Sequence, residues 1–206
     1  MLLDKVSLNA YKAAGDKTEK RESIQYIQVT EKHTIATDGH ILVQVEHQKD
    51  QKAEEFPYTG KTPIDLSGDK AVLIPATVAA DVVKRIPKGK NAFPILKTAF
   101  LSNGGDTQEI TTTDLTTPIT TTLRQPDLKF PNTKAVWPVE GDPIKATVWI
   151  AIPVLHKVLD CLSAMGATAI ELKVRLPEQA VEFRATSQEL TGRNITGLIM
   201  PYRMGK

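Results

Sequence analysis

The pair of side chains with the clearest potential for acid–base chemistry lies in the segment Thr37-Asp38-Gly39-His40. Asp38 and His40 could act together, because residues two apart on a strand point to the same face. No serine or cysteine nucleophile motif accompanies them, and Gly39 is typical of a tight turn between strands. We therefore expect a capped turn, assign no catalytic residue and expect a protein that is not an enzyme. A hydrolase using Asp38 and His40 stays open as an alternative.

The four histidines do not have the spacing of a metal site. His33, His40 and His47 are separated by odd intervals within extended chain, so they cannot all point to one face. His156 lies on another element, and the paired short spacings of zinc ligands are missing. We expect no metal and no other cofactor. Cys161, the one cysteine, excludes an internal disulfide framework and falls on the apolar face of a predicted helix, where it is typical of a small core residue.

Basic residues gather near the predicted helices. Lys84, Arg85, Lys88 and Lys90 lie at the end of the second helix, with Lys12 on the first and Lys157 on the third. Cations at a helix end are often simply solvated, and the helix dipole favours them there. The alternative is contact with DNA phosphates, which carries no sequence information. Because the net charge is only +2, any DNA contact must come from such local clusters.

Composition indicates an ordinary soluble globular protein. The 206 residues are 41% hydrophobic and 24% charged, enough for one core, or for one core and a smaller second one. No apolar run approaches the length that spans a bilayer. The first residues include Asp4 and lack the apolar stretch of a signal peptide. A single cysteine also fits a reducing compartment. We expect a cytoplasmic protein without membrane association.

The elements that must position these residues repeat three times as a strand, a helix and two or three strands. The first unit has strands over 5–8, 24–29 and 34–45, with a helix over 10–14 and a solvated charged loop over 16–23. The second has strands over 71–74, 99–102, 108–113 and 119–124, with a helix that starts at Pro75 and ends before Pro87. The third has strands over 146–150, 169–174, 180–185 and 194–200, with a helix from Pro153 that Gly166 closes.

The presence of three such units predicts how the chain divides into domains and where copies of it contact each other. One such unit cannot cover both faces of its sheet, whereas two units related by a pseudo-twofold can. Residues 1–138 therefore form a complete domain, and residues 139–206 form a single unit. That unit would leave a sheet edge and an apolar helix face, formed by Leu155, Val158, Leu159 and Leu162, without cover in its own domain. Exposed edges and patches mark interfaces, so we expect homo-oligomers in which two third units pair about a twofold.

Three further segments are predicted to lie around one groove. They are the turn region 36–42, the proline-bracketed stretch from Phe130 to Pro138, and the apolar tail 197–205, which contains Met200-Pro201-Tyr202-Arg203. Taken one at a time, they are explained as a turn, a domain exit packed on the core, and a last strand. An apolar tail with a proline and an arginine is nevertheless unusual, because chain ends normally fray into solvent.

Together, and in this order, the three segments resemble those of the bacterial sliding clamp, the β subunit of DNA polymerase III. The resemblance implies an α+β protein with the DNA-clamp (processivity) fold, built from βαβββ units with antiparallel sheets and helices on the inner face. Residues 1–138 resemble the family's middle domain, and residues 139–206 resemble the second half of its C-terminal domain. Family members carry three two-unit domains and close head-to-tail rings, so three units do not by themselves imply that ring.

The resemblance also implies sites and partners. It implies a shortened processivity factor that tethers DNA polymerase or other replication and repair proteins to double-stranded DNA, without sequence preference, through short peptide motifs. The implied alternative is a clamp-derived peptide-binding adaptor that never encircles DNA. The implied peptide pocket consists of Thr37, Gly39, His40, Leu42, Pro131, Val136, Leu198, Ile199, Met200, Pro201 and Arg203. The implied DNA-facing residues are Lys12, Lys84, Arg85, Lys88, Lys90 and Lys157. Ile41 and Ala135 replace family arginines and Tyr202 a common methionine, so we expect a less cationic, more apolar pocket.

Overall fold

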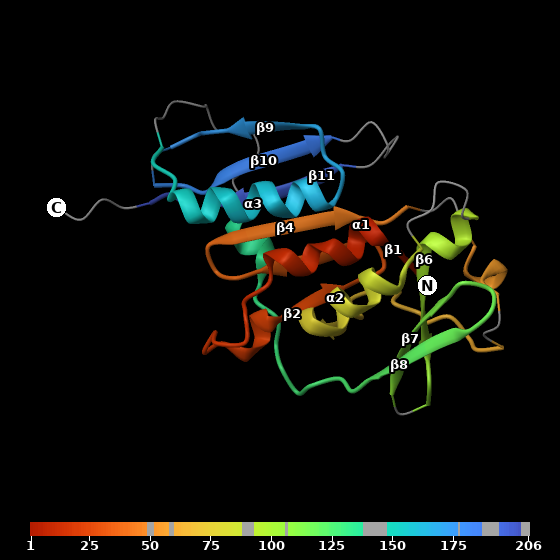
Figure 1. The fold of residues 1–206 in the computed structure, drawn as a ribbon. Helices are drawn as coiled ribbons and strands as arrows, with labels where there is room; N and C mark the ends of the chain where they lie inside the picture. The colour runs from red at the N-terminus through yellow and green to blue at the C-terminus, as the bar shows by residue number, and fades with distance from the viewer. Residues whose placement is uncertain are drawn as a thin grey trace.

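The computed structural model describes residues 1–48, 52–57, 60–87, 93–105, 107–137, 148–176, 178–186 and 194–202. Antiparallel sheets lie behind a row of helices (Figure 1). The strands are β1 (Leu2–Asp4), β2 (Tyr26–Val29), β3 (His33–Thr37), β4 (Ile41–Glu46), β5 (Val72–Pro75), β6 (Thr98–Asn103), β7 (Gln108–Thr113), β8 (Pro118–Leu123), β9 (Ala169–Lys173), β10 (Val181–Thr186) and β11 (Ile195–Ile199). The α-helices are α1 (Lys5–Leu8), α2 (Ala76–Arg85) and α3 (Ile152–Ala164). The 3-10 helices are η1 (Asn9–Ala13), η2 (Glu22–Gln25), η3 (Ala53–Glu55), η4 (Pro94–Lys97) and η5 (Thr133–Val136).

The first two units exchange their first strands. One sheet has the order β1-β6-β7-β8, so β1 of the first unit completes the sheet of the second unit. In return, β5 of the second unit pairs with β2 in the first unit's sheet. This reciprocal exchange joins the two units. The boundary between residues 138 and 139 lies outside the described residues and stays a prediction.

The third unit continues the sheet of the first. The larger sheet has the order β5-β2-β3-β4-β11-β10-β9, in which β4 and β11 form the junction. Gly197 sits at this junction, opposite Val43. A Cβ on Gly197 would collide with the carbonyl oxygen of Leu42 and with the ring of Phe183, so only glycine allows the strands to approach here.

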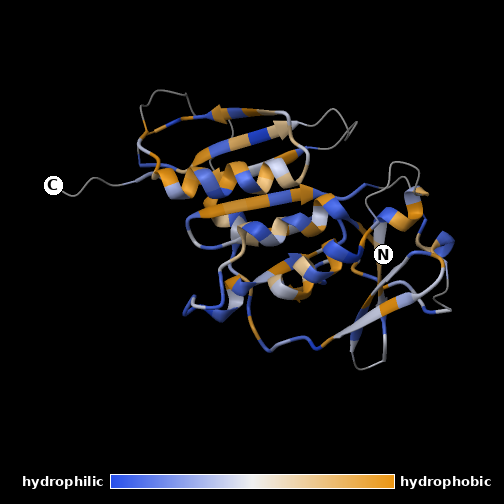
Figure 2. Cartoon of the chain, viewed as in Figure 1, coloured by the Kyte–Doolittle hydropathy of each residue, from blue (hydrophilic) through white to orange (hydrophobic). Residues whose placement is uncertain are grey.

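Two apolar cores lie on opposite faces of the large sheet. The helices α1 with η1, α2 and α3 lie side by side over one face (Figure 1) and present their apolar residues to it, including Leu8, Val82, Val158 and Leu162. Figure 2 shows that β4, in the middle of this sheet, is apolar along most of its length. The other face carries a smaller cluster, formed by Ile35, Leu42, Leu73, Phe130 and Leu198.

Several predicted elements differ from those observed. Residues 5–8 form helix α1 rather than a strand, because the Asp4 carboxylate accepts a hydrogen bond from the Ser7 N–H and caps a helix there. The expected helix over 10–14 is the 3-10 helix η1, and η2 shortens the expected strand over 24–29 to β2. Of the expected strand 146–150, residues 148–150 are described and are not in a strand, since none of the strands in the described ranges pairs with them.

The expected uncovered face of the third helix is only partly uncovered. Val158 and Leu162 are buried, because α3 packs against η1 of the first unit. The Asn9 side chain strengthens this contact by donating a hydrogen bond to the carbonyl oxygen of Ala164 (2.8 Å). Leu155 is partly buried and Leu159 stays 45% exposed. The prediction that this apolar face lacks cover was therefore wrong for Val158 and Leu162.

No described helix combines the length and hydropathy needed to cross a bilayer. Within the described ranges, histidine, cysteine and carboxylate side chains do not gather in a group that could hold a metal ion.

Candidate functional site

A groove of about 210 Å³ lies on the outer face of the sheet, where β4 meets β11. Its floor is apolar and buried, made by Ile24, Ile41, Leu42 and Leu198. Val136 and Met200, on either side, are 47% and 45% exposed. A buried apolar floor between half-exposed apolar rims is the form of surface that accepts side chains of a partner. The complete lining is Arg21, Ile24, Thr37, Gly39, His40, Ile41, Leu42, Pro131, Asn132, Thr133, Val136, Leu198 and Met200.

The structure brings eight of the eleven predicted pocket residues into this lining: Thr37, Gly39, His40, Leu42, Pro131, Val136, Leu198 and Met200. Strand periodicity explains the clearest exception. Leu42 and Leu198 are direct cross-strand partners and share the outer face, so Ile199 must point to the helix side. Ile199 is fully buried there, and its placement in the pocket is corrected. Pro201 is half-buried but outside the lining, and Arg203 lies outside the described residues.

The turn that forms one wall is held by its own side chains. The Asp38 Oδ1 atom accepts hydrogen bonds from the backbone N–H groups of His40 and Ile41, both at 2.9 Å. The Thr37 hydroxyl donates to the Ile41 carbonyl oxygen (2.7 Å). Gly39 has φ +87, a left-handed conformation that favours glycine. Asp38 is therefore occupied in shaping the turn, as expected for a capped turn, and the Met200 N–H joins the tail to it through the His40 carbonyl oxygen (2.9 Å).

Lys157 ties the third unit to this turn. Its ammonium group donates to Asp38 Oδ2 (2.6 Å) and to the carbonyl oxygen of Ala14 (3.2 Å). Burial raises the pKa of Asp38, but the hydrogen bonds from Lys157 and from the Ile41 and His40 N–H groups outweigh it, so the pKa lies below its ordinary value. Lys157 was predicted to face DNA; in the structure its ammonium group is engaged by the protein itself.

Sequence reasoning missed five lining residues: Arg21, Ile24, Ile41, Asn132 and Thr133. Arg21 changes the chemistry of the groove, because its guanidinium lies against Gly39 and supplies a cation. The expectation of a less cationic pocket was based on Ile41 and Ala135 and overlooked this residue. Arg21 falls in the loop that was interpreted as solvated, and no motif connects it with the distant turn. Ile24 and Ile41 could have been found, since both are apolar residues in or next to predicted strands.

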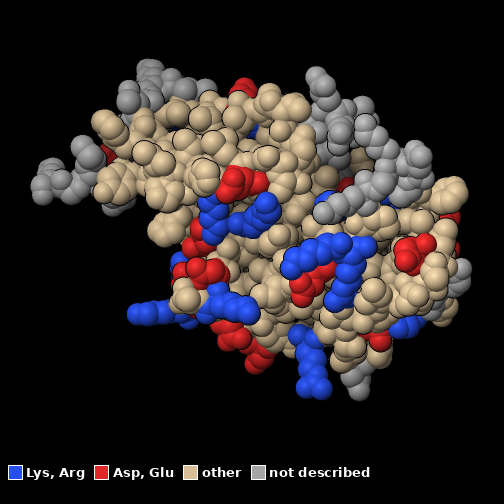
Figure 3. Space-filling model, viewed as in Figure 1, with Lys and Arg blue, Asp and Glu red and all other residues tan. Residues whose placement is uncertain are grey.

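The other described residues predicted to face DNA, Lys12, Lys84 and Arg85, lie on the helix side. Figure 3 shows lysine and arginine side chains gathered over the lower two of the three helices, while the part of the molecule around α3 carries few charges. Lys84 is paired with Asp81 (3.1 Å), and the Arg85 guanidinium donates to the Thr121 hydroxyl (2.8 Å). Lys12, on η1, is half-buried. Lys88 and Lys90 lie outside the described residues.

The buried cysteine has the properties of a core residue. Cys161 is fully buried, and its thiol lies 3.8 Å from the carbonyl oxygen of Asn9. Burial raises the pKa of this thiol to about 12, so it is not a thiolate at neutral pH. This confirms the prediction of a small core residue.

The exchanged sheets and the row of helices together define the DNA-clamp fold, and comparison with solved structures agrees. The chain is similar to the DNA polymerase III β subunit of Thermotoga maritima (14% identity, TM-score 0.59, covering 100% of this chain and 65% of that one). It is also similar to the β subunit of Caulobacter crescentus, with 15% identity and a TM-score of 0.61, covering 99% of this chain and 66% of that one. A third similar structure is the Pseudomonas aeruginosa sliding clamp bound to griselimycin, with 12% identity and a TM-score of 0.62, covering 99% of this chain and 65% of that one. No family model and no curated protein matches the sequence.

These similarities confirm the predicted fold and the resemblance to bacterial sliding clamps at the level of structure. The chain spans about two thirds of the length of these clamps. The identities are too low to carry function by themselves.

Proposed function

We propose that this chain is a sliding-clamp-like tether that holds replication or repair proteins near DNA and performs no reaction itself. The groove between β4 and β11 carries this proposal, because its buried floor and half-exposed rim suit the side chains of a short partner peptide. Arg21 adds a cation at one wall, which favours a peptide that combines apolar side chains with a carboxylate. Polymerase and other DNA-processing proteins are the partners we propose.

The helix side supports the DNA half of the proposal. Lysine and arginine side chains gather over this face in Figure 3, and the pairs there are exposed, so phosphates can compete for them. Contacts of this kind hold DNA without reading its sequence and weaken as salt is added. In this arrangement the groove and the basic helices lie on opposite faces of the large sheet, so one protein could contact DNA and a partner together.

Binding to the groove can be tested with two probes: a fluorescent short peptide carrying two leucines and an aspartate, and griselimycin, which the Pseudomonas aeruginosa clamp binds. We expect both to bind the protein. Val136→Ala with Met200→Ala should weaken binding by about 1–3 kcal/mol, as expected when rim contacts at a binding site are removed. Tyr202→Ala is the matched control, since Tyr202 is 55% exposed nearby but outside the lining. Equal binding by the double variant and the control would contradict the proposed groove.

A second candidate is a peptide-binding adaptor that does not encircle DNA. The engagement of Lys157 by Asp38 favours it, because one of the predicted DNA contacts is then used within the protein. The net charge of +2 likewise gives no strong attraction to DNA. The two functions differ in retention: a tether that encloses DNA should stay on circular DNA and slide off linear DNA, whereas an adaptor should be retained on neither.

A further inference from the structure

The third unit lacks the strand exchange that completes the first two. In the first pair of units, β1 and β5 cross to the other unit and pair with β6 and β2. In the third unit, β9 is the corresponding edge of the large sheet, and among the described residues its second edge has no strand beside it. Residues 148–151, which precede α3 as β5 precedes α2, likewise pair with no strand in the part of the chain that the structure describes. The unit thus has one strand segment to give and one edge to receive.

The second and third units match position by position around their helices. When the first residues of α2 and α3 are aligned, Val72 and Ile74 of β5 fall opposite Val148 and Ile150. Within the helices, Ala79 corresponds to Leu155, Val82 to Val158 and Val83 to Leu159, and Ile86, directly after α2, corresponds to Leu162. Every one of these positions is apolar in both units. The third unit therefore keeps the side chains that the second unit uses to pack against its exchange partner.

Burial separates these positions into two groups. Val82 and Ile86, and their counterparts Val158 and Leu162, are buried in both units. Val72, Ile74, Ala79 and Val83 are also buried, but their counterparts Val148, Ile150 and Leu155 are only partly buried and Leu159 is 45% exposed. Ile152, one turn before Leu155 on the same stripe of α3, is 81% exposed. The positions left open are those that the second unit buries in strand exchange or against a neighbouring helix.

The edge strand shows the same pattern. Ile27 and Val29 of β2 are buried, with β5 beside them in the sheet and the helices over them. Ile170 and Leu172 hold the corresponding alternate positions of β9, and Leu172 is 44% exposed. An edge strand with exposed apolar side chains is a site where another strand can pair. Most of the surface around α3 in Figure 3 is uncharged, which suits a close contact between apolar side chains.

We propose that the third unit is completed by the third unit of a second copy of this chain, through reciprocal strand exchange about a twofold axis. The two existing exchanges define its register, because in each the residue before the helix pairs with the first residue of the receiving strand: Asp4 with Thr98, and Pro75 with Tyr26. By this rule Ala151 pairs with Ala169 of the other copy. It follows that Ile150 lies opposite Ile170 and Val148 opposite Leu172, so apolar side chains meet on the helix side.

A second copy fits better than an unrelated partner, because the giving segment and the receiving edge belong to the same unit. A twofold operation brings each onto the other, so both exchanges form at once and each β9 gains a strand beside it, as β2 and β6 do in the existing exchanges. The stripe of Ile152, Leu155 and Leu159 then packs against its own copy across the axis. In the single chain, the segment is held beside the tail by the Tyr202 N–H, which donates to the Trp149 carbonyl oxygen (2.6 Å). Pairing of two third units requires neither DNA nor a bound peptide.

Light scattering during gel filtration of the full chain tests the assembly. We expect about twice the 22.6 kDa of one chain. Leu159→Lys with Leu172→Lys should shift the protein to monomer and raise the dimer dissociation constant more than about tenfold, since both side chains are exposed in the single chain and become buried in the dimer. Leu115→Lys with Ile119→Lys is the matched control on another surface and should stay dimeric. A monomeric wild type, or a dimer unaffected by the first pair of substitutions, would overturn the proposal.

Cross-linking tests the register. Trp149 and Glu171 are exposed and fall opposite each other on the outer face in the proposed pairing. The double variant Trp149→Cys with Glu171→Cys should form covalent dimers with a short bifunctional maleimide, at low protein concentration. Each single cysteine variant, and Trp149→Cys with Ile119→Cys, should give little covalent dimer. Cross-linking within one chain, which leaves a monomer on a denaturing gel, would contradict exchange between copies.

Discussion

The ammonium nitrogen of Lys157 lies 2.6 Å from Oδ2 of Asp38, and this contact joins helix α3 to the turn that forms one wall of the groove. The two residues are far apart in the sequence and belong to the third and first units. Their contact crosses the helix side of the junction, while Leu42 and Leu198 meet directly in the sheet itself. The position of the groove wall therefore depends on the third unit being docked.

Neutralising this pair should destabilise the docked third unit. In Asp38→Asn the acceptor for the turn N–H groups remains, but Lys157 loses its charged partner, which should lower the free energy of unfolding by about 1–3 kcal/mol. Urea unfolding at neutral pH measures this. Asp81→Asn is the control, because the Asp81–Lys84 pair has a similar length but is exposed and should contribute about 0–0.5 kcal/mol. Equal effects of the two substitutions would mean that the Lys157 contact does not stabilise the junction.

The same contact predicts a pH dependence. The pKa of Asp38 is lowered in the folded protein, so its contribution to stability is complete above the unfolded-state pKa of about 3.9 and is lost as the pH falls through the lower folded-state value. The stability difference between the wild type and Asp38→Asn should therefore be constant from pH 5 to pH 7, on the order of the value at neutral pH, and shrink below about pH 4. Urea titrations across this range measure it. A difference that grows on acidification would reverse the sign of the proposed coupling.

Much of the fold could be predicted from the sequence, since strand alternation and helix spacing depend on local chemistry. Val78, Val82 and Ile86 follow helical spacing and lie in or beside α2. The errors came where one side chain or a distant neighbour decides the conformation. Asp4 turns an apparent strand into a helix through a cap. Residues 148–150 have strand-like composition, but a strand needs a strand beside it, and none of the described strands pairs with them.

The groove was partly predictable for the same reason. Leu42 and Leu198 face each other on the groove side of β4 and β11, and Ile199 was misplaced because the face that each residue of β11 occupies depends on its register with β4. Arg21 could not be predicted, since its position next to Gly39 results from how a polar loop folds back on the turn. The contacts of Lys84 and Lys157 also differ, although both are lysines. Lys84 pairs with an exposed carboxylate, whereas Lys157 reaches a partly buried one.

Gly39→Ala should separate the shape of the groove from the stability of the fold. Gly39 and Gly68 both have left-handed backbones, so alanine at either position should lower stability by about 1–2 kcal/mol. An added Cβ at Gly39 also meets the guanidinium of Arg21, whereas one at Gly68 meets nothing. Because a long side chain can move aside, Gly39→Ala should displace Arg21 rather than unfold the protein. Binding of the aspartate-containing peptide should fall about 3- to 10-fold in Gly39→Ala and stay unchanged in Gly68→Ala.

Peptide affinity in an Arg21→Ala background serves as the check. There, Gly39→Ala should have little further effect on binding, because the cation it displaces is already gone. An undiminished effect of Gly39→Ala in that background would show that the substitution acts on the groove by another route.

Charge reversal on the helix side should remove DNA association without changing the fold. Lys84 and Arg85 end α2 and are exposed, so Lys84→Glu with Arg85→Glu should cost little stability. The variant should lose most binding to double-stranded DNA and show a smaller salt dependence, by about one unit of slope for each phosphate contact removed. Filter binding or fluorescence anisotropy at several salt concentrations measures both quantities.

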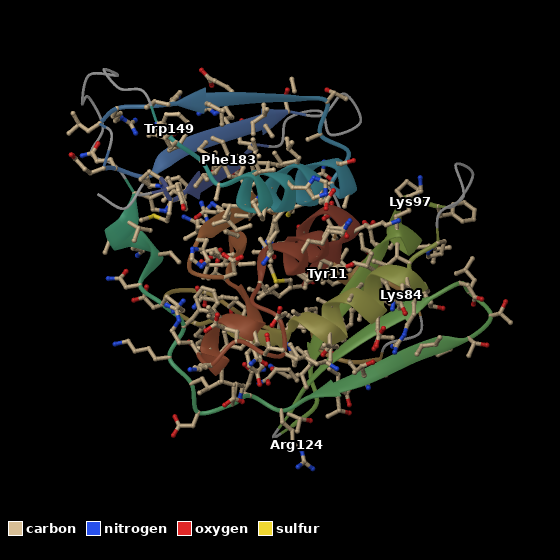
Figure 4. All side chains as sticks on the ribbon, turned by 60° about the vertical axis from the view of Figure 1, so that its left-hand side comes forward. Tyr11, Lys84, Lys97, Arg124, Trp149 and Phe183 are labelled. Atoms are coloured by element: carbon tan, nitrogen blue, oxygen red, sulfur yellow. The ribbon has the colours of Figure 1, made fainter. Side chains whose placement is uncertain are left out.

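The matched control reverses two charges elsewhere. Arg124 and Lys129 are exposed on the segment after β8, and Figure 4 shows Arg124 projecting from the end of the molecule, well away from Lys84 on α2. Arg124→Glu with Lys129→Glu changes the net charge by the same amount, so a purely global electrostatic effect would weaken DNA binding equally in both variants. Only a loss confined to the Lys84 and Arg85 variant assigns the DNA contact to the helix face. Equal losses would leave the groove as the functional surface and favour the adaptor.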